Sequence, residues 1–191
     1  MISTDIRLGD VQRDLYNKTF TGEGVSKYYP KGSQKAYYRM SYSPAFLEIR
    51  HKSPWGPSEE KILVQYKSAE DMNFISIEFF LDGKRQNIIF EDSLEKLENP
   101  EEPLIKYLFL DPRVVLMSAE DVREIPIAEP GKCHQIVALD LSELPFGPKV
   151  VSEFFTNGLK LEKMRMRQFL GDKEILSQNM EILFSYNDLP R

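Results

Sequence analysis

Cysteine and histidine are the scarcest reactive residues in this sequence. It contains one cysteine, Cys133, and two histidines, His51 and His134. A single cysteine excludes an internal disulfide, and neither histidine lies in a His-Glu-x-x-His motif. On a strand, Cys133 and His134 would point to opposite faces, so we interpret this pair as structural and not as a catalytic couple. We therefore expect no metal, no cofactor and a reducing compartment.

Long apolar runs are also missing. No stretch approaches the roughly 20 consecutive apolar residues that a membrane-spanning helix needs, and the first residues, Met1 to Arg7, contain no run of signal-peptide length. The sequence predicts a cytoplasmic protein without a membrane span. The alternative is that a signal peptide has been removed.

Positive charge is in deficit, with 25 lysines and arginines against 30 aspartates and glutamates and a formal charge of -5. This sign repels phosphate backbones and argues against nucleic acid as a partner. No nucleophile elbow, phosphate loop or dinucleotide fingerprint is present, since Gly22-Glu23-Gly24 lacks a third glycine. The acidic run from Glu91 to Glu102 is typical of a solvated surface. These absences favour a protein without catalytic activity.

Apolar residues recur along the chain with the spacing of helices and strands. Leu8, Val11 and Leu15 predict a short amphipathic helix, whereas the glycines and proline of Thr21 to Ser33 predict a loop. Alternation and β-branched content predict strands elsewhere. The predicted strands are 35–42, 46–51, 62–67, 74–81, 88–90, 114–117, 133–141, 149–156, 159–169 and 175–186.

Two dipeptides predict tight hairpin turns between these strands. Asp82-Gly83 and Asn157-Gly158 both combine residues that tolerate positive φ. In the last strand one set of alternating residues is apolar and should be buried. That set is Met180, Ile182, Phe184 and Tyr186.

The segment 91–112 divides the strands into two groups and is predicted to be acidic and partly helical, with Pro112 as its stop. The whole pattern predicts an α+β protein, mainly antiparallel β. Its expected form is a barrel or two-sheet sandwich with a short N-terminal helix and a central helix. We expect one β-rich domain over 1–191, and two small β-rich units, 1–117 and 118–191, are the alternative.

Trp55 is the first binding candidate. It lies between Pro54, Gly56 and Pro57 in a predicted surface loop, where a large ring would anchor a partner. The competing interpretation is that Trp55 folds back over the core.

Arg165 and Arg167 form a second candidate. They share one face of a predicted strand, while Met164 and Met166 share the other, so a small basic stripe would meet an anion. The competing interpretation is that both arginines pair with carboxylates on a neighbouring strand.

One pattern resembles a known family. Lys35-Ala36-Tyr37-Tyr38-Arg39, followed by Asp71-Met72-Asn73-Phe74-Ile75-Ser76, is similar to the Arg-x-x-x-Arg and Asp-x-Ser-x-x-Gly motifs of PilZ domains. Lys35 replaces the first arginine of that pattern, Asn73 the serine and Ser76 the glycine. The resemblance covers the first β half only. It implies a degenerate PilZ-like barrel with Lys35 and Arg39 as candidate ligand contacts.

Two functional hypotheses follow. The first is a noncatalytic binding or adaptor protein that engages a protein partner through its loops or an exposed sheet edge. The second is a barrel-shaped carrier or sensor, in which interior side chains such as Met180 and Phe184 surround a small ligand. An enzyme using carboxylate chemistry is the weakest option, because no acid pair with matched roles is evident.

Overall fold

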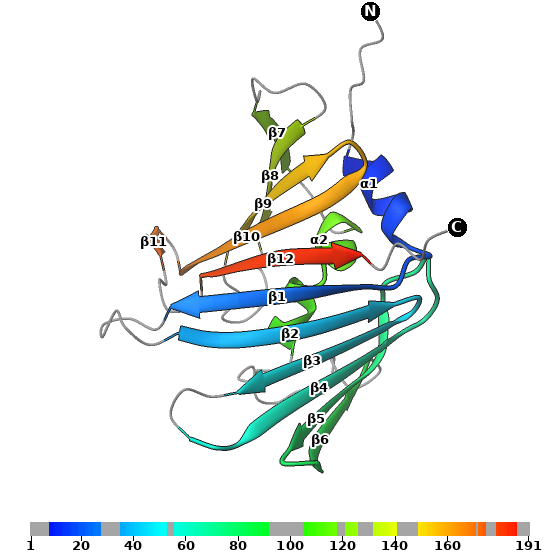
Figure 1. The fold of residues 1–191 in the computed structure, drawn as a ribbon, viewed down its shortest axis with the longest axis vertical. Helices are drawn as coiled ribbons and strands as arrows, with labels where there is room; N and C mark the ends of the chain where they lie inside the picture. The colour runs from blue at the N-terminus through cyan, green and yellow to red at the C-terminus, as the bar shows by residue number, and fades with distance from the viewer. Residues whose placement is uncertain are drawn as a thin grey trace, which may run out of the picture.

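The computed structural model describes residues 8–27, 35–52, 56–91, 105–117, 121–125, 132–140, 149–170, 172–174 and 179–186. One strongly twisted antiparallel sheet dominates these residues, and short helices lie against it (Figure 1). The prediction of a mainly antiparallel β protein with a few helices is confirmed. Among the described residues, no helix is long and apolar enough to cross a membrane.

The helical elements are α1 (Leu8–Leu15), the 3-10 helix η2 (Ile105–Leu110) and α2 (Pro112–Met117). The first group of strands is β1 (Phe20–Lys27), β2 (Lys35–Ser43), β3 (Phe46–Lys52), β4 (Glu59–Tyr66), β5 (Phe74–Leu81) and β6 (Lys84–Phe90). The second group is β7 (Asp121–Ile125), β8 (Lys132–Asp140), β9 (Lys149–Asn157), β10 (Lys160–Leu170), β11 (Lys173–Glu174) and β12 (Met180–Tyr186).

The sheet is continuous and open. Its strand order is β6-β5-β4-β3-β2-β1-β12-β10-β9-β8-β7, with β11 paired to β10 beside this path. The first and last strands pair with each other in the middle of the sheet. Strands β6 and β7 are consecutive in sequence but lie at its two ends. The expected barrel or two-sheet sandwich is therefore not confirmed, because the edge strands β6 and β7 do not pair with each other and the sheet stays open.

Alternating side chains give the sheet a buried inner face and a more exposed outer face. In β12, Met180, Ile182 and Phe184 are buried, as the alternation predicted, while Leu183 between them is exposed. Strand β4 shows the same pattern. Helix α1 also follows its prediction, since Val11 and Leu15 are fully buried. The apolar residues of both halves thus form one cluster on the inner face.

Both predicted hairpins are present. In the β5–β6 hairpin, Asp82 and Gly83 have φ of 48° and 81°, so both central residues lie in the left-handed region that an Asp-Gly turn favours. In the β9–β10 hairpin, Asn157 pairs with Lys160, and the turn residues are Gly158 and Leu159. Positive φ occurs there at Gly158, so the turn lies one residue later than Asn157-Gly158.

The loop predicted from Thr21 onward is wrong up to Lys27, because β1 occupies these residues. Gly22 and Gly24 lie on the crowded inner face, between β12 and β2. A Cβ atom at Gly24 would lie 2.9 Å from the sulfur of Met180, and one at Gly22 would lie 3.0 Å from Ile182 Cγ2. These glycines mark a close approach of side chains to a strand and do not mark a loop.

The strand predicted at 114–117 is also wrong, because these residues belong to α2. The helix η2 ends at Leu110, just before Pro112, and Pro112 also begins α2, at the position where its missing N–H is not needed. Asp111 precedes it as the N-cap, and its Oδ1 accepts a hydrogen bond from the Arg113 backbone N–H at 3.0 Å. An Asp-Pro pair before an apolar run is therefore a helix start in this chain.

The β2–β3 turn contains a non-glycine residue with positive φ. Pro44 precedes Ala45, whose φ is 58°, and the Ala45 carbonyl accepts a hydrogen bond from the Tyr66 N–H at 2.9 Å. The left-handed conformation costs an L-residue roughly 1–2 kcal/mol. The turn is held in place by its neighbours although Ala45 does not favour it.

Substitution of Ala45 tests this description. Ala45→Gly should leave the free energy of unfolding unchanged or raise it by up to about 1 kcal/mol, because glycine removes the backbone strain but adds unfolded-state entropy. Ala45→Val should lower it by at least about 1 kcal/mol, since a β-branched residue disfavours this conformation. Urea unfolding with unchanged m-values is the measurement. A glycine variant less stable than the valine variant would contradict the turn geometry.

Candidate functional site

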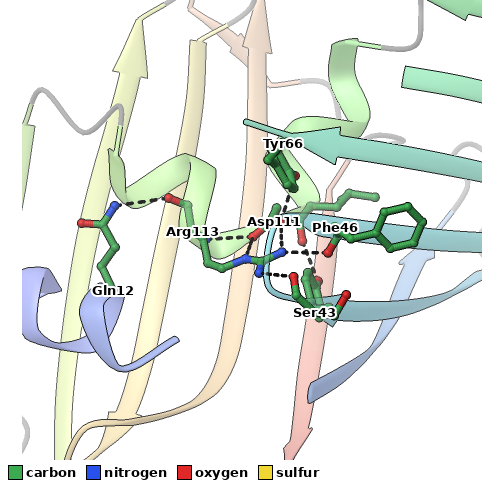
Figure 2. A network of polar contacts seen from close by, with 8 residues as sticks. Gln12, Ser43, Phe46, Tyr66, Asp111 and Arg113 are labelled. Carbon is green, nitrogen blue, oxygen red and sulfur yellow. Dashed lines mark hydrogen bonds and ion pairs between the residues drawn. The ribbon is translucent and has the colours of Figure 1, made fainter. Parts of the chain in front are cut away.

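A buried ion pair joins the central helical segment to the inner face of the sheet. Arg113 and Asp111 both have exposed fractions of 0%. Arg113 Nη2 lies 2.8 Å from Asp111 Oδ2, and Arg113 Nε donates to Asp111 Oδ1 at 3.0 Å. Figure 2 shows the two side chains facing each other, with the Tyr66 hydroxyl group beside the carboxylate.

The remaining polar atoms of this pair bind the sheet. Arg113 donates to the backbone carbonyls of Ser43 at 2.8 Å and Phe46 at 3.2 Å, on either side of the β2–β3 turn. The Tyr66 hydroxyl donates to Asp111 Oδ2 at 2.8 Å. The side chain of Gln12, in α1, donates to the Arg113 backbone carbonyl at 3.3 Å. Asp111 and Arg113 therefore connect η2, α2, α1 and three strands.

Aromatic rings surround the guanidinium group. Its Cζ atom lies 5.9 Å from the ring centre of Phe20 and 5.7 Å from those of Tyr42 and Tyr66. Burial lowers the pKa of Arg113, but the charge of Asp111 and its hydrogen bonds outweigh this effect and raise the pKa overall. The pair is satisfied by the chain itself, so we interpret it as a structural connection and not as a ligand site.

A groove of about 550 Å³ lies on the sheet over β1, β2, β3 and β4. Most of its side chains come from the outer face, where alternate residues of adjacent strands stand in register. Glu23 pairs with Arg39, and Arg39 with Arg50; beside them, Val25 pairs with Tyr37. The groove is lined by Glu23, Gly24, Val25, Tyr37, Tyr38, Arg39, Arg50, Lys52 and Glu59.

The charges of this groove are unequally paired. Arg50 binds Glu48 at 2.7 Å and Glu59 at 3.0 Å, and the hydrogen bond and charge of Glu48, followed by those of Glu59, raise the pKa of Arg50. Arg39 lies 3.9 Å from Glu23, and both side chains are 74% exposed. Arg39 is therefore held much more loosely than Arg50 and is accessible to a partner.

An aromatic contact supports the strands beneath this groove. Tyr38 of β2 stacks on His51 of β3 with ring centres 4.2 Å apart and planes at 9°. His51 Nδ1 lies 3.0 Å from Glu60 Oε2 on β4. Three neighbouring strands are thus connected on the inner side of the sheet, which gives the outer groove a fixed base.

The sequence candidates fall in different places. Arg39 lines the groove, and Lys35 lies at the start of the same strand, in register with Lys27. Arg165 and Arg167 lie on β10, on the other side of β1 and β12. The structure therefore brings Lys35 and Arg39 onto one strand and keeps both away from Arg165 and Arg167. Trp55 lies outside the described residues.

Arg165 and Arg167 pair with carboxylates on the strands that flank β10. Arg165 Nη2 lies 3.2 Å from Glu181 Oε2 on β12, and Arg167 Nη2 lies 3.4 Å from Glu153 Oε1 on β9. The interpretation that these two arginines pair with neighbouring strands is confirmed.

The two parts of the PilZ-like pattern are separated. Arg39 lies on β2, whereas Asp71 precedes β5, and β3 and β4 lie between these strands. Asp71 accepts hydrogen bonds from the Asn73 N–H at 3.0 Å and its Nδ2 at 2.7 Å, within its own turn. The two parts of the pattern therefore lie on strands that are not neighbours in the sheet.

No family model and no curated protein matches the chain. Among the described residues, no group of three or more His, Cys, Asp and Glu side chains is placed to hold a metal ion. The interpretation of the site therefore rests on its own geometry.

Sequence reasoning did not select Tyr37, Glu23, Arg50 or Lys52 as groove residues. The signal that they share is alternation along the strand. Charged or aromatic side chains at alternate positions of neighbouring strands lie on the same solvent-facing side of the sheet. Register, which the sequence did not give for β1, was needed to bring Glu23 next to Arg39. Arg113 was missed because it lies between the predicted helical segment 91–112 and the strand predicted at 114–117.

Removal of Arg113 tests the structural connection. Arg113→Met should lower the free energy of unfolding by about 3–5 kcal/mol, because Asp111 is left buried without its counter-charge. Arg165→Met, which breaks an exposed pair, should cost less than about 1 kcal/mol. The double variant Asp111→Asn/Arg113→Met should regain part of the loss, because no buried charge remains. Urea unfolding measures all three, and equal losses for both single variants would contradict the assigned role.

The buried tyrosines predict a fall in stability at alkaline pH. Burial, and after it the charge of Asp111, raises the pKa of Tyr42 and Tyr66 well above the ordinary value of 10.0. Above pH 10.0 these tyrosines lose their protons in the unfolded chain but keep them in the folded chain. The free energy of unfolding should therefore be full below this pH and fall above it by about 1.4 kcal/mol per pH unit for each tyrosine. Tyr66→Phe should make this fall shallower, and Tyr37→Phe at the surface serves as control. Unfolding free energies measured from about pH 9 to about pH 12 would contradict the account if all three proteins lost stability equally.

Proposed function

We propose that this chain is a noncatalytic protein-binding module that uses the outer-face groove over β1–β4. The observation that carries the proposal is the pair Tyr37 and Arg39, which stand two residues apart on the outer face of β2. Tyr37 is 61% exposed, and Arg39 has only a loose contact with Glu23. Tyrosine and arginine are enriched among the residues that contribute most to binding at protein interfaces.

The position of β2 in the sheet supports this function. Strand β2 pairs along its length with β1 and β3, so the backbone that carries both side chains is held on two sides. The stacked Tyr38 and His51 rings lie beneath them. Binding to a fixed surface loses little backbone entropy, which favours affinity.

The edge strand β6 is a less suitable docking site than the groove. Lys84 and Arg85 begin this strand, and its pairing with β5 contains a bulge near Gln86. Gln86 Nε2 donates to the Lys84 carbonyl at 3.2 Å, and Asn87 Oδ1 accepts from the Ile88 N–H at 2.8 Å. Charges, bulges and occupied backbone groups are the features by which edge strands avoid further pairing.

A second candidate function is carriage of a small ligand on the inner face. Three buried polar atoms there have no hydrogen-bond partner within the part of the chain that the structure describes: His51 Nε2, Ser152 Oγ and Thr156 Oγ1. Buried polar atoms normally have partners, so a molecule bound beside β9 would account for Ser152 and Thr156, whereas His51 lies on β3, with four strands between β3 and β9. Met180 and Phe184 lie on the same face.

Affinity capture from the native extract tests the first proposal. Proteins retained by the unaltered chain should be depleted about tenfold by Tyr37→Ala or Arg39→Ala, as expected for residues worth more than about 1 kcal/mol in an interface. Leu159→Ala, at an exposed position in the β9–β10 turn away from the groove, is the matched control and should retain the same proteins. Quantitative mass spectrometry provides the measurement, with thermal unfolding to confirm that each variant is folded.

Equal retention by all four proteins would contradict the proposal. Native mass spectrometry of the same purified chain distinguishes the second candidate. A retained small-molecule mass that Ser152→Ala and Thr156→Val remove would support carriage on the inner face, and a chain without added mass would contradict it.

A further inference from the structure

The outer face carries a row of cations that crosses three strands. Arg39 of β2 is in register with Arg50 of β3, and Arg50 is in register with Lys61 of β4. Like charges directly opposite each other on neighbouring strands destabilise a sheet. The cation row, as we call Arg39, Arg50 and Lys61, is therefore an unfavourable arrangement for the fold alone.

The three members of the cation row differ in how they are compensated. Arg50 has two carboxylates, Glu48 and Glu59, within 3.0 Å. The Lys61 ammonium group lies 4.5 Å from the ring centre of Phe80. Arg39 has the weakest compensation, because its contact with Glu23 is 3.9 Å long between two highly exposed side chains. Arg39 is thus the member best placed to bind an external anion.

A further lysine stands at one end of the groove. Lys52 is 77% exposed and lies 4.0 Å from Glu59, a carboxylate that also binds Arg50. Among the lining residues, cations (Arg39, Arg50 and Lys52) outnumber carboxylates (Glu23 and Glu59), although the whole chain carries a formal charge of -5. A local positive surface on an acidic chain favours a short anionic partner over a long one.

We infer that the groove binds a short acidic peptide segment of a partner protein, with a carboxylate on Arg39 and an apolar or aromatic side chain against Tyr37. The inference rests on the proposed protein-binding function and specifies the chemistry of its partner. A planar guanidinium group binds a carboxylate through two parallel hydrogen bonds, which the long contact with Glu23 does not provide. The partner's carboxylate displaces Glu23 from Arg39 when it binds.

The size of the groove sets the length of this segment. Four strands at a spacing of about 4.8 Å extend over roughly 15 Å. An extended peptide of about eight residues reaches roughly 27 Å, so it crosses the groove with residues to spare. Such a segment brings a few carboxylates to the cation row and leaves its ends outside the groove.

Fluorescence anisotropy with defined peptides tests the inference. The probe is a labelled peptide of about eight residues in which glutamate and serine alternate around a central leucine. Its counterpart has glutamine in place of every glutamate. The unaltered chain should bind the glutamate peptide about tenfold more tightly than the glutamine peptide, and added salt should reduce the difference.

Two groove variants and one control locate the site. Arg39→Gln should weaken binding of the glutamate peptide about tenfold, whereas Arg167→Gln on β10 should leave it unchanged. Glu23→Gln should strengthen binding about twofold or more, because it removes the carboxylate that competes for Arg39. Loss of the fold would weaken binding, so tighter binding by the Glu23→Gln variant is a result that misfolding does not explain.

Several results would overturn the inference. Equal affinity for the glutamate and glutamine peptides, lost together in Tyr37→Ala, would remove the acidic preference while the protein-binding function stands. Binding of neither peptide at about 1 mM, together with unaltered capture by Tyr37→Ala, would remove both. Tighter binding of an oligothymidylate of similar length than of the glutamate peptide would show that the row takes phosphates and would contradict the assignment to a protein segment.

Discussion

The buried pair of Arg113 and Asp111 is the constraint on which the described arrangement depends. A charge with no exposed surface persists only when its polar atoms have partners, and those of Arg113 are the Asp111 carboxylate and two backbone carbonyls of the sheet. The segment 105–117 is thereby fixed against β2, β3 and β4. This segment lies in the chain between β6 and β7, the two edge strands, and its contacts are with the inner face of the sheet.

Because the inner face is covered, the outer face is the one that we propose for recognition. Successive residues along each strand point to opposite faces of the sheet. Met40 and Ile49 fill the core, while their chain neighbours Arg39 and Arg50 face solvent. The core constrains only the first kind. Arg39, which is loosely held, and the exposed Tyr37 lie outside the core, and they belong to the surface for which we propose binding.

The sequence predicted what depends on local periodicity. Alternation in β4 and β12, the helical spacing of Val11 and Leu15, and the Asp82-Gly83 turn are all local signals, and the structure contains each of them. Gly22 and Gly24 misled because glycine signals a turn locally, whereas here it makes room for Met180 and Ile182 from a strand far away in sequence. Arg39 was selected through the PilZ-like motif, but its neighbours Glu23 and Arg50 follow from strand pairing, which depends on long-range register. Asp111 and Arg113 meet Tyr66 only after folding.

Native-state hydrogen exchange tests the central claim most directly. The amides of Val114 and Val115 donate to the Asp111 carbonyl at the start of α2. If the buried pair fixes this segment to the sheet, these amides should open with about the same free energy as the amides of β1 and β12. Exchange of Val114 and Val115 at a much lower free energy, with β1 and β12 still protected, would show that the segment opens independently and would contradict the account.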